Sequence, residues 1–511
     1  MKLDSATATH IEKLKRLYSH ALPLRFMPHR LIVGPTGVGK SNYVTQEALK
    51  AVAEGYWLTF AAPHEQFGLD FISELYARYG KAILKRLHVN DTRDMETVVM
   101  QRFIQSSQES SQLKRMLEND IYAGAFLETV ARRRKDITDI AEKPVLEKYT
   151  KLAAKLAQNQ SKWFPEWWLP YAFIPKHAIH DYLVTHCTDP EVRREFETFK
   201  SFPVREQLSI LDPIFRLLAG VLASPPIVAR TSKPVIFDKR AFLNAGGITV
   251  ILGGASDDAT SVVIGSDFQE TMFLAKQGLS RPGIYIQDEI NNYRLAGAFE
   301  SRMHSTIRWR GVSVWSVTQS FDFPSEEIRN NYLQNTDHVW FRQGTSEMAK
   351  AAAEDMLGAL NAFKVHHVDK TTRQVHKGFE TIKRVTRGKA TNPHGDETIT
   401  ENEGETLVPI YGEHIEERPV YESPSDQLIW LAQRIQQLQW CCWIREQNRA
   451  PYELSVPLLP DSWAFPGLKE RKIAECLTLL KQRPEYQTPE LTVPETTTPM
   501  VKRATKRGMN S

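Results

Sequence analysis

Short apolar runs alternate with helix-like segments in the first part of the chain. The runs at Arg30–Val33, Tyr56–Ala61 and Arg86–Val89 have the length and the apolar character of buried strands. A helical periodicity separates these runs, and it also precedes them at residues 8–20. Because alternating strands and helices are typical of a parallel sheet, this pattern predicts an α/β fold.

Between residues 93 and 230 the periodicity becomes mostly helical, and Lys, Glu, Gln and Arg are frequent. A tryptophan-rich segment, residues 163–168, interrupts this pattern. Its tryptophans could stack on exposed bases, but packing at a helix corner is the simpler interpretation. Since strand patterns return after residue 230, we interpret residues 93–230 as an all-α domain inserted into the α/β core.

Strand-like runs resume after this segment and alternate again with helical ones. They are Val235–Phe237, Ile248–Leu252, Gly283–Gln287, Val312–Val317 and Val339–Phe341. Helical patterns follow near 267–277 and 346–357. The core is therefore expected in two halves, residues 1–92 with the N-terminal helix and residues 231–345.

Residues 346–485 are expected to form a C-terminal extension, followed by a disordered basic tail at 486–511. The extension contains a basic, strand-like stretch at 364–389 and an acidic segment at 396–405, which is predicted to be a loop. The basic stretch could contact phosphates, but a solvated hairpin or loop is the simpler interpretation.

Aromatic residues are concentrated near the end of this extension. Trp430, Trp440 and Trp443 recur at helical spacing within residues 425–447. The spacing predicts a long helix there, either buried or facing a second subunit.

Composition narrows the class of protein. The chain has 511 residues, 41% of them hydrophobic and 25% charged, and a formal net charge of +4. This charge is too small to indicate nucleic-acid binding by itself. Four cysteines without a CxxC pair exclude a disulfide framework and favour a reducing, cytoplasmic compartment. Neither a signal peptide nor a membrane-spanning run is recognisable, so recruitment to the inner face of a membrane would need a partner in trans.

The segment that follows the first strand matches the P-loop pattern in full. It reads Gly34-Pro35-Thr36-Gly37-Val38-Gly39-Lys40-Ser41. Its glycines let backbone N–H groups surround phosphates, Lys40 would reach the β- and γ-phosphates of ATP, and the Ser41 hydroxyl would bind Mg²⁺. A chance glycine turn is the alternative, but the strand before the loop and the helix after it favour a nucleotide site.

Two acids end a later strand. Asp288 and Glu289 follow the apolar run Gly283–Gln287. Asp288 is predicted to hold Mg²⁺, and Glu289 is predicted to activate the attacking water. An acidic helix N-cap would give the same pair, but the presence of a P-loop favours the metal site.

The next apolar strand ends in Thr318 and Gln319, and arginines precede it. Because carboxyl ends of parallel strands face the ligand crevice, Gln319 is predicted to sense the γ-phosphate or to position the water. Arg302, Arg308 and Arg310 could instead belong to a solvated helix face. Arg308 is the first choice for a cation that acts on the ATP site of a neighbouring subunit.

In this order the segments resemble the HerA/FtsK superfamily, and within it the VirD4/TraG coupling proteins and the VirB4-type ATPases. The resemblance rests on the P-loop, the Gly-Gly strand at 246–252, the acid pair, the Thr-Gln strand end and the spacing of Arg308. It implies a hexameric ring with ATP between subunits and DNA in its channel. Two departures are the short stretch before residue 34, where such coupling proteins carry membrane helices, and the segment Ala62–Gln66, which lacks the usual charged pattern.

We therefore expect a RecA-like P-loop NTPase core with a parallel-rich sheet, an inserted all-α domain and a C-terminal extension. The expected function is ATP-driven DNA translocation, in conjugative transfer, DNA packaging or related handling of mobile elements. Two alternatives stay open: a protein-translocating ATPase of the VirB4 type, and a nucleotide-switched assembly protein that does not pump DNA.

Overall fold

The computed structural model describes most of the chain. The described residues are 28–107, 109, 111–131, 144–174, 177–254, 257–291, 302–304, 306–357, 365–391, 393, 395, 397–421, 423–446, 451–458 and 467–490. The helix expected at 8–20 and nearly all of the expected basic tail lie outside them. The chain divides into two compact units, Met1–Ala349 with Ile435–Ser511, and Lys350–Arg434.

A nine-stranded sheet forms the centre of the first unit, in the order β12-β11-β8-β1-β7-β6-β2-β5-β3. The seven strands from β8 to β3 are parallel, whereas β11 and β12 are antiparallel. The strands are β1 (His29–Val33), β2 (Trp57–Ala62), β3 (Leu87–Asp91), β5 (Ile248–Leu252), β6 (Gly283–Gln287), β7 (Val312–Thr318), β8 (Thr336–Trp340), β11 (Cys441–Arg445) and β12 (Tyr452–Ser455). All residues of β2, β5, β6, β7 and β8 are buried, as expected for a parallel sheet covered on both faces.

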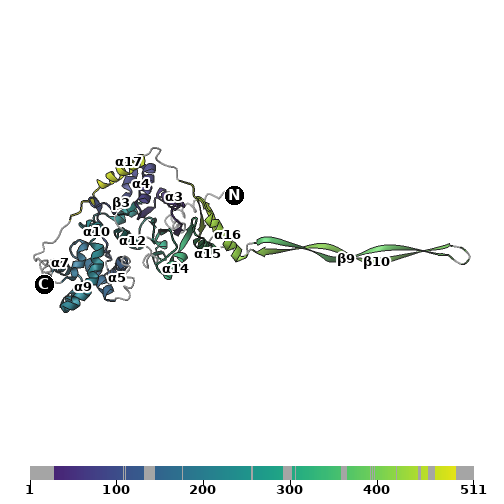
Figure 1. Ribbon diagram of the computed structural model, residues 1–511, viewed down its shortest axis with the longest axis horizontal. Coiled ribbons are helices and arrows are strands. Elements are labelled where there is room, and N and C mark those ends of the chain that lie inside the picture. Colours follow the sequence, from purple (N-terminus) through teal and green to yellow (C-terminus); the bar gives the residue numbers. More distant parts are fainter. Residues whose placement is uncertain are drawn as a thin grey trace, which may run out of the picture. The chain divides into compact units, whose positions relative to one another are not determined.

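Helices connect the parallel strands and cover the sheet (Figure 1). They include α3 (Lys40–Ala53), α4 (Glu65–Tyr79), η1 (Gly80–Lys85), α11 (Lys239–Asn244), α12 (Asp257–Gln277), η5 (Arg308–Arg310) and α14 (Glu326–Asn335). Packing between the neighbouring strands β2 and β6 is close: a Cβ on Gly283 would lie 2.0 Å from the indole ring of Trp57. Glycine is therefore required at the first residue of β6.

The segment predicted as an inserted helical domain is mostly helical. It contains the short strand β4 (Val98–Val99) and the helices α5 (Gln112–Ala131), α6 (Pro144–Gln158), η4 (Glu166–Phe173), α7 (Ala178–Thr185), α8 (Pro190–Ser201), α9 (Val204–Leu222) and α10 (Pro225–Arg230). Trp168 is buried here and packs edge-to-face on Tyr182, whereas Trp163 is exposed. Glu166 is also buried; its carboxylate accepts hydrogen bonds from the backbone N–H groups of Phe103 and Ile104.

The second unit contains most of α15 (Ser346–Leu357), a long antiparallel hairpin and most of one further helix. Strands β9 (Val365–Thr391) and β10 (Glu397–Tyr421) pair along their whole length, and α16 (Pro424–Gln436) follows. The first strand agrees with the strand-like stretch predicted at 364–389. The acidic loop predicted at 396–405 is wrong, because these residues belong to β10 from Glu397 onward, where pairing with β9 satisfies their backbone groups.

Two further predictions are wrong in the first unit. Residues Val235–Phe237 form no strand; they are irregular and lead to α11. Asp238 caps the N-terminus of α11, because its Oδ1 accepts a hydrogen bond from the N–H of Ala241. The helix predicted at 425–447 ends at Gln436, and Cys441–Arg445 form strand β11 beside β8. Trp440 and Trp443 are therefore not on a helix, since a left-handed residue (Trp440, φ 53°) and sheet pairing replace the helical backbone there.

The end of the described chain returns to the far edge of the sheet. Helix α17 (Leu468–Lys481) packs against α4, and β13 (Tyr486–Gln487) pairs with β4. The Tyr486 hydroxyl donates to the carbonyl oxygen of Val89 at 3.0 Å and accepts from its N–H at 2.8 Å. The C-terminal extension thus completes the core of the first unit at both edges of the sheet.

Candidate functional site

The P-loop joins β1 to α3, and its backbone needs its glycines. Gly37 and Gly39 have φ values of 81° and 101°, in the left-handed region that L side chains rarely adopt. A Cβ on Gly34 would lie 2.7 Å from the Cβ of Phe341. The Gly34 N–H donates to the carbonyl oxygen of Thr318 at 3.2 Å, so the start of the loop is held against the end of β7.

Lys40 lies at the first turn of α3 with its side chain folded toward the loop. Its Nζ donates to the carbonyl oxygens of Gly34 and Pro35, the latter at 2.9 Å. Burial lowers the pKa of Lys40, and the charges of Glu289 and Asp288 oppose that shift. The ammonium group therefore lies within electrostatic reach of both acids.

The other loop residues are more accessible. Thr36 and Ser41 are exposed, whereas Val38 is half-buried and packs on the hydrophobic core. Gly39 precedes the helix without a side-chain cap, and the first turn of α3 contains no acid. Such a helix start attracts a negatively charged ligand.

Asp288 and Glu289 lie at the end of β6 and are both buried. The Asp288 N–H donates to the carbonyl oxygen of Ala61 at 3.1 Å, which fixes the turn beside the end of β2. Burial and the charge of Glu289 raise the pKa of Asp288 to about 7, and Lys40 opposes the shift. Glu289 has a left-handed backbone with φ 53°, a strained conformation for glutamate that is typical of functional sites.

Gln319 completes this group from the end of β7. Its Nε2 donates to Oε1 of Glu289 at 2.6 Å. Asn291, which the sequence analysis did not select, donates through Nδ2 to Oγ1 of Thr318 at 3.1 Å. The two hydrogen bonds tie the turn after β6 to the end of β7.

Arg308 lies at the amino-terminal end of β7, whereas the P-loop lies at the carboxyl ends of the parallel strands. It is the first residue of η5, just before β7. Burial lowers the pKa of His29, and the charges of His304 and Arg308 lower it further. Strand β7 has seven residues, so its two ends are about 20 Å apart. The structure does not bring Arg308 to the P-loop of its own chain, and the prediction that it acts in trans stays a prediction.

The C-terminal extension also reaches the P-loop. A Cβ on Gly39 would lie 3.7 Å from atoms of the Phe341 and Trp440 rings. Asn42 of α3 donates through Nδ2 to the carbonyl oxygen of Pro457 at 2.6 Å. No local motif signals these contacts, because Trp440 and Pro457 come from the end of the chain and meet α3 only through the sheet.

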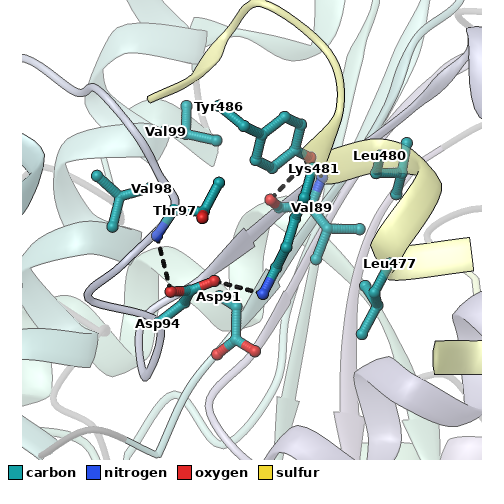
Figure 2. Close-up of a pocket in the computed structure, with 10 residues that line it drawn as sticks. All are labelled: Val89, Asp91, Asp94, Thr97, Val98, Val99, Leu477, Leu480, Lys481 and Tyr486. Carbon is teal, nitrogen blue, oxygen red and sulfur yellow. Dashed lines mark hydrogen bonds and ion pairs between the residues drawn. The ribbon is translucent and has the colours of Figure 1, made fainter. Parts of the chain in front are cut away.

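A pocket lies elsewhere, beside the edge strand β3 (Figure 2). Residues of β3 and β4 line one side, and Leu477, Leu480 and Lys481 of α17 line the other. Lys481 forms an ion pair with Asp94 at 2.5 Å across it. The pocket contains no P-loop residue and neither Asp288 nor Glu289, so it is not the candidate nucleotide site.

The P-loop follows the parallel strand β1, the acid pair follows β6, and the polar end of β7 lies between them. This arrangement defines the fold of a RecA-like P-loop NTPase core. This confirms the predicted fold class. Among the described helices, none has both the length and the apolar composition that crossing a bilayer requires.

Solved structures share this fold, whereas no protein-family model and no curated protein sequence matches the chain. The bacterial conjugative coupling protein TrwBΔN70, in its unbound monoclinic form, aligns with a TM-score of 0.51 at 14% identity over 86% of each chain. The plasmid coupling protein TrwB in complex with ADP and Mg²⁺ aligns with a TM-score of 0.50 at 15% identity, over 84% of this chain and 86% of that one. The chain thus shares the fold of these coupling-protein structures, the resemblance that the sequence analysis predicted.

Proposed function

We propose that this protein is an ATPase that uses hydrolysis to translocate DNA. One observation supports this most strongly: Lys40, Asp288, Glu289 and Gln319 gather beside the carboxyl ends of β1, β6 and β7. Within this group, Nε2 of Gln319 donates a hydrogen bond to Oε1 of Glu289 at 2.6 Å. Two acids beside a P-loop lysine fit a Mg²⁺-bound triphosphate, because the cation and the metal balance charges that burial would otherwise disfavour. The solved structures with the same fold are by name a conjugative coupling protein and a plasmid coupling protein.

Each residue has a distinct role in this proposal. The P-loop N–H groups and Lys40 bind the phosphates, and Ser41 and Asp288 hold Mg²⁺. Bound Mg²⁺ would supply positive charge beside the transferring phosphate, and the role of Lys40 is to stabilise the negative charge that develops there. Glu289 takes a proton from the attacking water, and Gln319 orients the Glu289 carboxylate.

The experiment is ATP hydrolysis with and without DNA, for the wild type and Glu289→Gln. Gln keeps the shape of the side chain but cannot accept the proton, so turnover is expected to fall by roughly 10²–10⁴. Nucleotide binding should persist. The matched control is Glu326→Gln on the surface of α14, which should hydrolyse ATP at the wild-type rate.

The results separate the proposed activity from its alternatives. DNA-stimulated hydrolysis in the wild type supports a DNA motor. Hydrolysis without stimulation favours the protein-translocating alternative, and binding without hydrolysis favours the nucleotide-switched assembly protein. Unchanged hydrolysis in Glu289→Gln contradicts the role of Glu289.

The position of Arg308 motivates a second part of the proposal, an oligomeric ring in which Arg308 acts on a neighbour. Arg308→Ala and Glu289→Gln should each be inactive alone. In a mixed ring, the Glu289→Gln chain supplies Arg308 to an intact acid pair, so mixing should restore part of the activity. Absence of restoration contradicts action in trans, and Arg302→Ala is the matched control.

A further inference from the structure

The hairpin of β9 and β10 is unusually long for a sheet of only two strands. Its ladder runs from the pair Thr391 and Glu397 to the pair Val365 and Tyr421. At about 3.3 Å per residue, 25 residues of β10 span roughly 80 Å. In the described part of the chain no third strand pairs with either one, so both outer edges keep backbone groups available for pairing (Figure 1).

Large apolar side chains project from this ribbon into solvent. Eleven of them are exposed, with Phe379 at 61% and Leu407 at 64%. The full set is Val368, Val375, Phe379, Ile382, Val385, Ile399, Leu407, Val408, Ile410, Tyr411 and Ile415. An isolated two-stranded hairpin is marginally stable in water, and further strands or a covering layer are what stabilise one.

The two strands carry opposite charge. β9 has seven lysines and arginines against two acids, a net charge of +5, and β10 has seven glutamates against one arginine, a net charge of −6. One long edge of the ribbon is therefore basic and the other acidic. Together the strands carry −1, which does not favour a polyanion such as DNA as the partner.

Part of this charge is balanced inside the hairpin. Cross-strand ion pairs join Lys370 to Glu417 at 2.7 Å, Lys389 to Glu397 at 2.7 Å, and Arg387 to Glu401. Four further charged residues do not face an opposite charge across the ladder. Arg384 is opposite Gly404, Glu403 is opposite Val385, Glu413 is opposite Gln374, and Lys377 lies in the bulge between two registered pairs.

We propose that the hairpin binds the hairpins of other copies of this chain, with β9 of one copy beside β10 of the next. The strands alternate in direction, so adding hairpins in this order continues an antiparallel sheet. The basic edge of each copy then meets the acidic edge of its neighbour, and the exposed apolar side chains become covered. Such a head-to-tail contact closes into a ring when the rotation between copies closes. Pro409 and Pro419 lack an N–H, so pairing along β10 is interrupted at these positions.

The test uses charge reversal in the full chain, at the positions that do not face an opposite charge within the hairpin. The first variant is Lys377→Glu with Arg384→Glu, which lowers the net charge of β9 from +5 to +1. The second is Glu403→Lys with Glu413→Lys, which reduces the net charge of β10 from −6 to −2. A matched control makes the same change in exposed residues of the helical segment, Lys114→Glu with Lys162→Glu.

Sedimentation velocity over a range of protein concentrations measures self-association. Wild type and control are expected to associate, and each hairpin variant alone should associate roughly tenfold more weakly. An equimolar mixture of the two variants should recover the wild-type affinity, because the unchanged β9 of the second variant then meets the unchanged β10 of the first. Recovery on mixing cannot come from repaired folding within one hairpin, so it separates pairing between copies from a structural role.

Three outcomes overturn the proposal: a wild type that stays monomeric, hairpin variants that associate like the wild type, and a mixture that does not recover. The inference does not depend on the nucleotide site. ATP hydrolysis measured on the same samples reports separately on the proposed function.

Discussion

A buried ion cluster beneath β6 gives a prediction that links stability to the site. Lys239 of α11 and Asp267 of α12 are 5% and 9% exposed, and Lys239 Nζ donates to Oδ1 of Asp267 at 2.6 Å. The same ammonium donates to Oε2 of Glu270 at 3.2 Å. The hydroxyl of Tyr285, in the strand that leads to Asp288, donates to Oδ2 of Asp267 at 3.1 Å.

Lys239→Met removes the positive charge and keeps a side chain of similar length. Burial lowers the pKa of Lys239, but the two carboxylates more than compensate and raise it overall, so the wild-type lysine is charged. Burial also raises the pKa of Glu270, and only Lys239 opposes this among the groups nearby. One buried and one half-buried carboxyl group, Asp267 and Glu270, without their cation should reduce the free energy of unfolding by about 3–5 kcal/mol.

The assay is denaturant unfolding at pH 8 and at pH 5.5. The loss of unfolding free energy in Lys239→Met should be smaller at pH 5.5 than at pH 8, because the unpaired carboxyl groups then take up protons in the folded state. The triple variant Lys239→Met, Asp267→Asn, Glu270→Gln has no charge left in the cluster and should recover most of the stability. A loss below about 1 kcal/mol in the single variant, or a triple variant less stable than the single one, refutes this reasoning.

Two other predictions concern individual hydrogen bonds and buried acids. Gln319→Ala should lower ATP turnover by roughly 10–100-fold with little change in nucleotide affinity, since the Glu289 carboxylate loses a donor; steady-state kinetics and equilibrium binding measure the two, and an unchanged turnover contradicts it. Burial raises the pKa of Glu166 to about 7 from 4.5, so its contribution to stability is present below pH 4.5 and is lost as the pH rises through 7. Glu166→Gln should remove this part of the pH dependence of the free energy of unfolding, which is about 3 kcal/mol between pH 4.5 and 8. Denaturant unfolding midpoints across this pH range measure it, and an unchanged pH profile in the variant contradicts the prediction.

Much of the core and the residues of the candidate site could be predicted from sequence, because their signals are local. The P-loop needs glycines at positions where a positive φ or a close backbone approach requires them, and Gly37 and Gly39 show this. Asp288 and Gln319 each follow an apolar strand, and parallel strands bring their carboxyl ends to one edge. The meeting of Gln319 with Glu289 follows from the adjacency of β6 and β7.

The remaining features depend on pairing between distant segments. The acidic residues from Glu397 onward have the composition of a solvated loop, and only the partner strand β9 makes them a strand. Cys441–Arg445 pair with β8 across about a hundred residues of sequence, a contact that no local periodicity encodes. For the same reason, the approach of Trp440 to Gly39 could not be inferred from its spacing to other tryptophans.

The most direct test of the account is the binding of Mg²⁺–ATP to wild type and Lys40→Ala by isothermal titration calorimetry. We predict micromolar or tighter binding to the wild type, and a loss of at least about a hundredfold in the variant, because the buried ammonium group is the cation of the site. Lys50→Ala, at the exposed end of the same helix, should bind as the wild type does. Equal affinity of wild type and Lys40→Ala would contradict a nucleotide site at this P-loop.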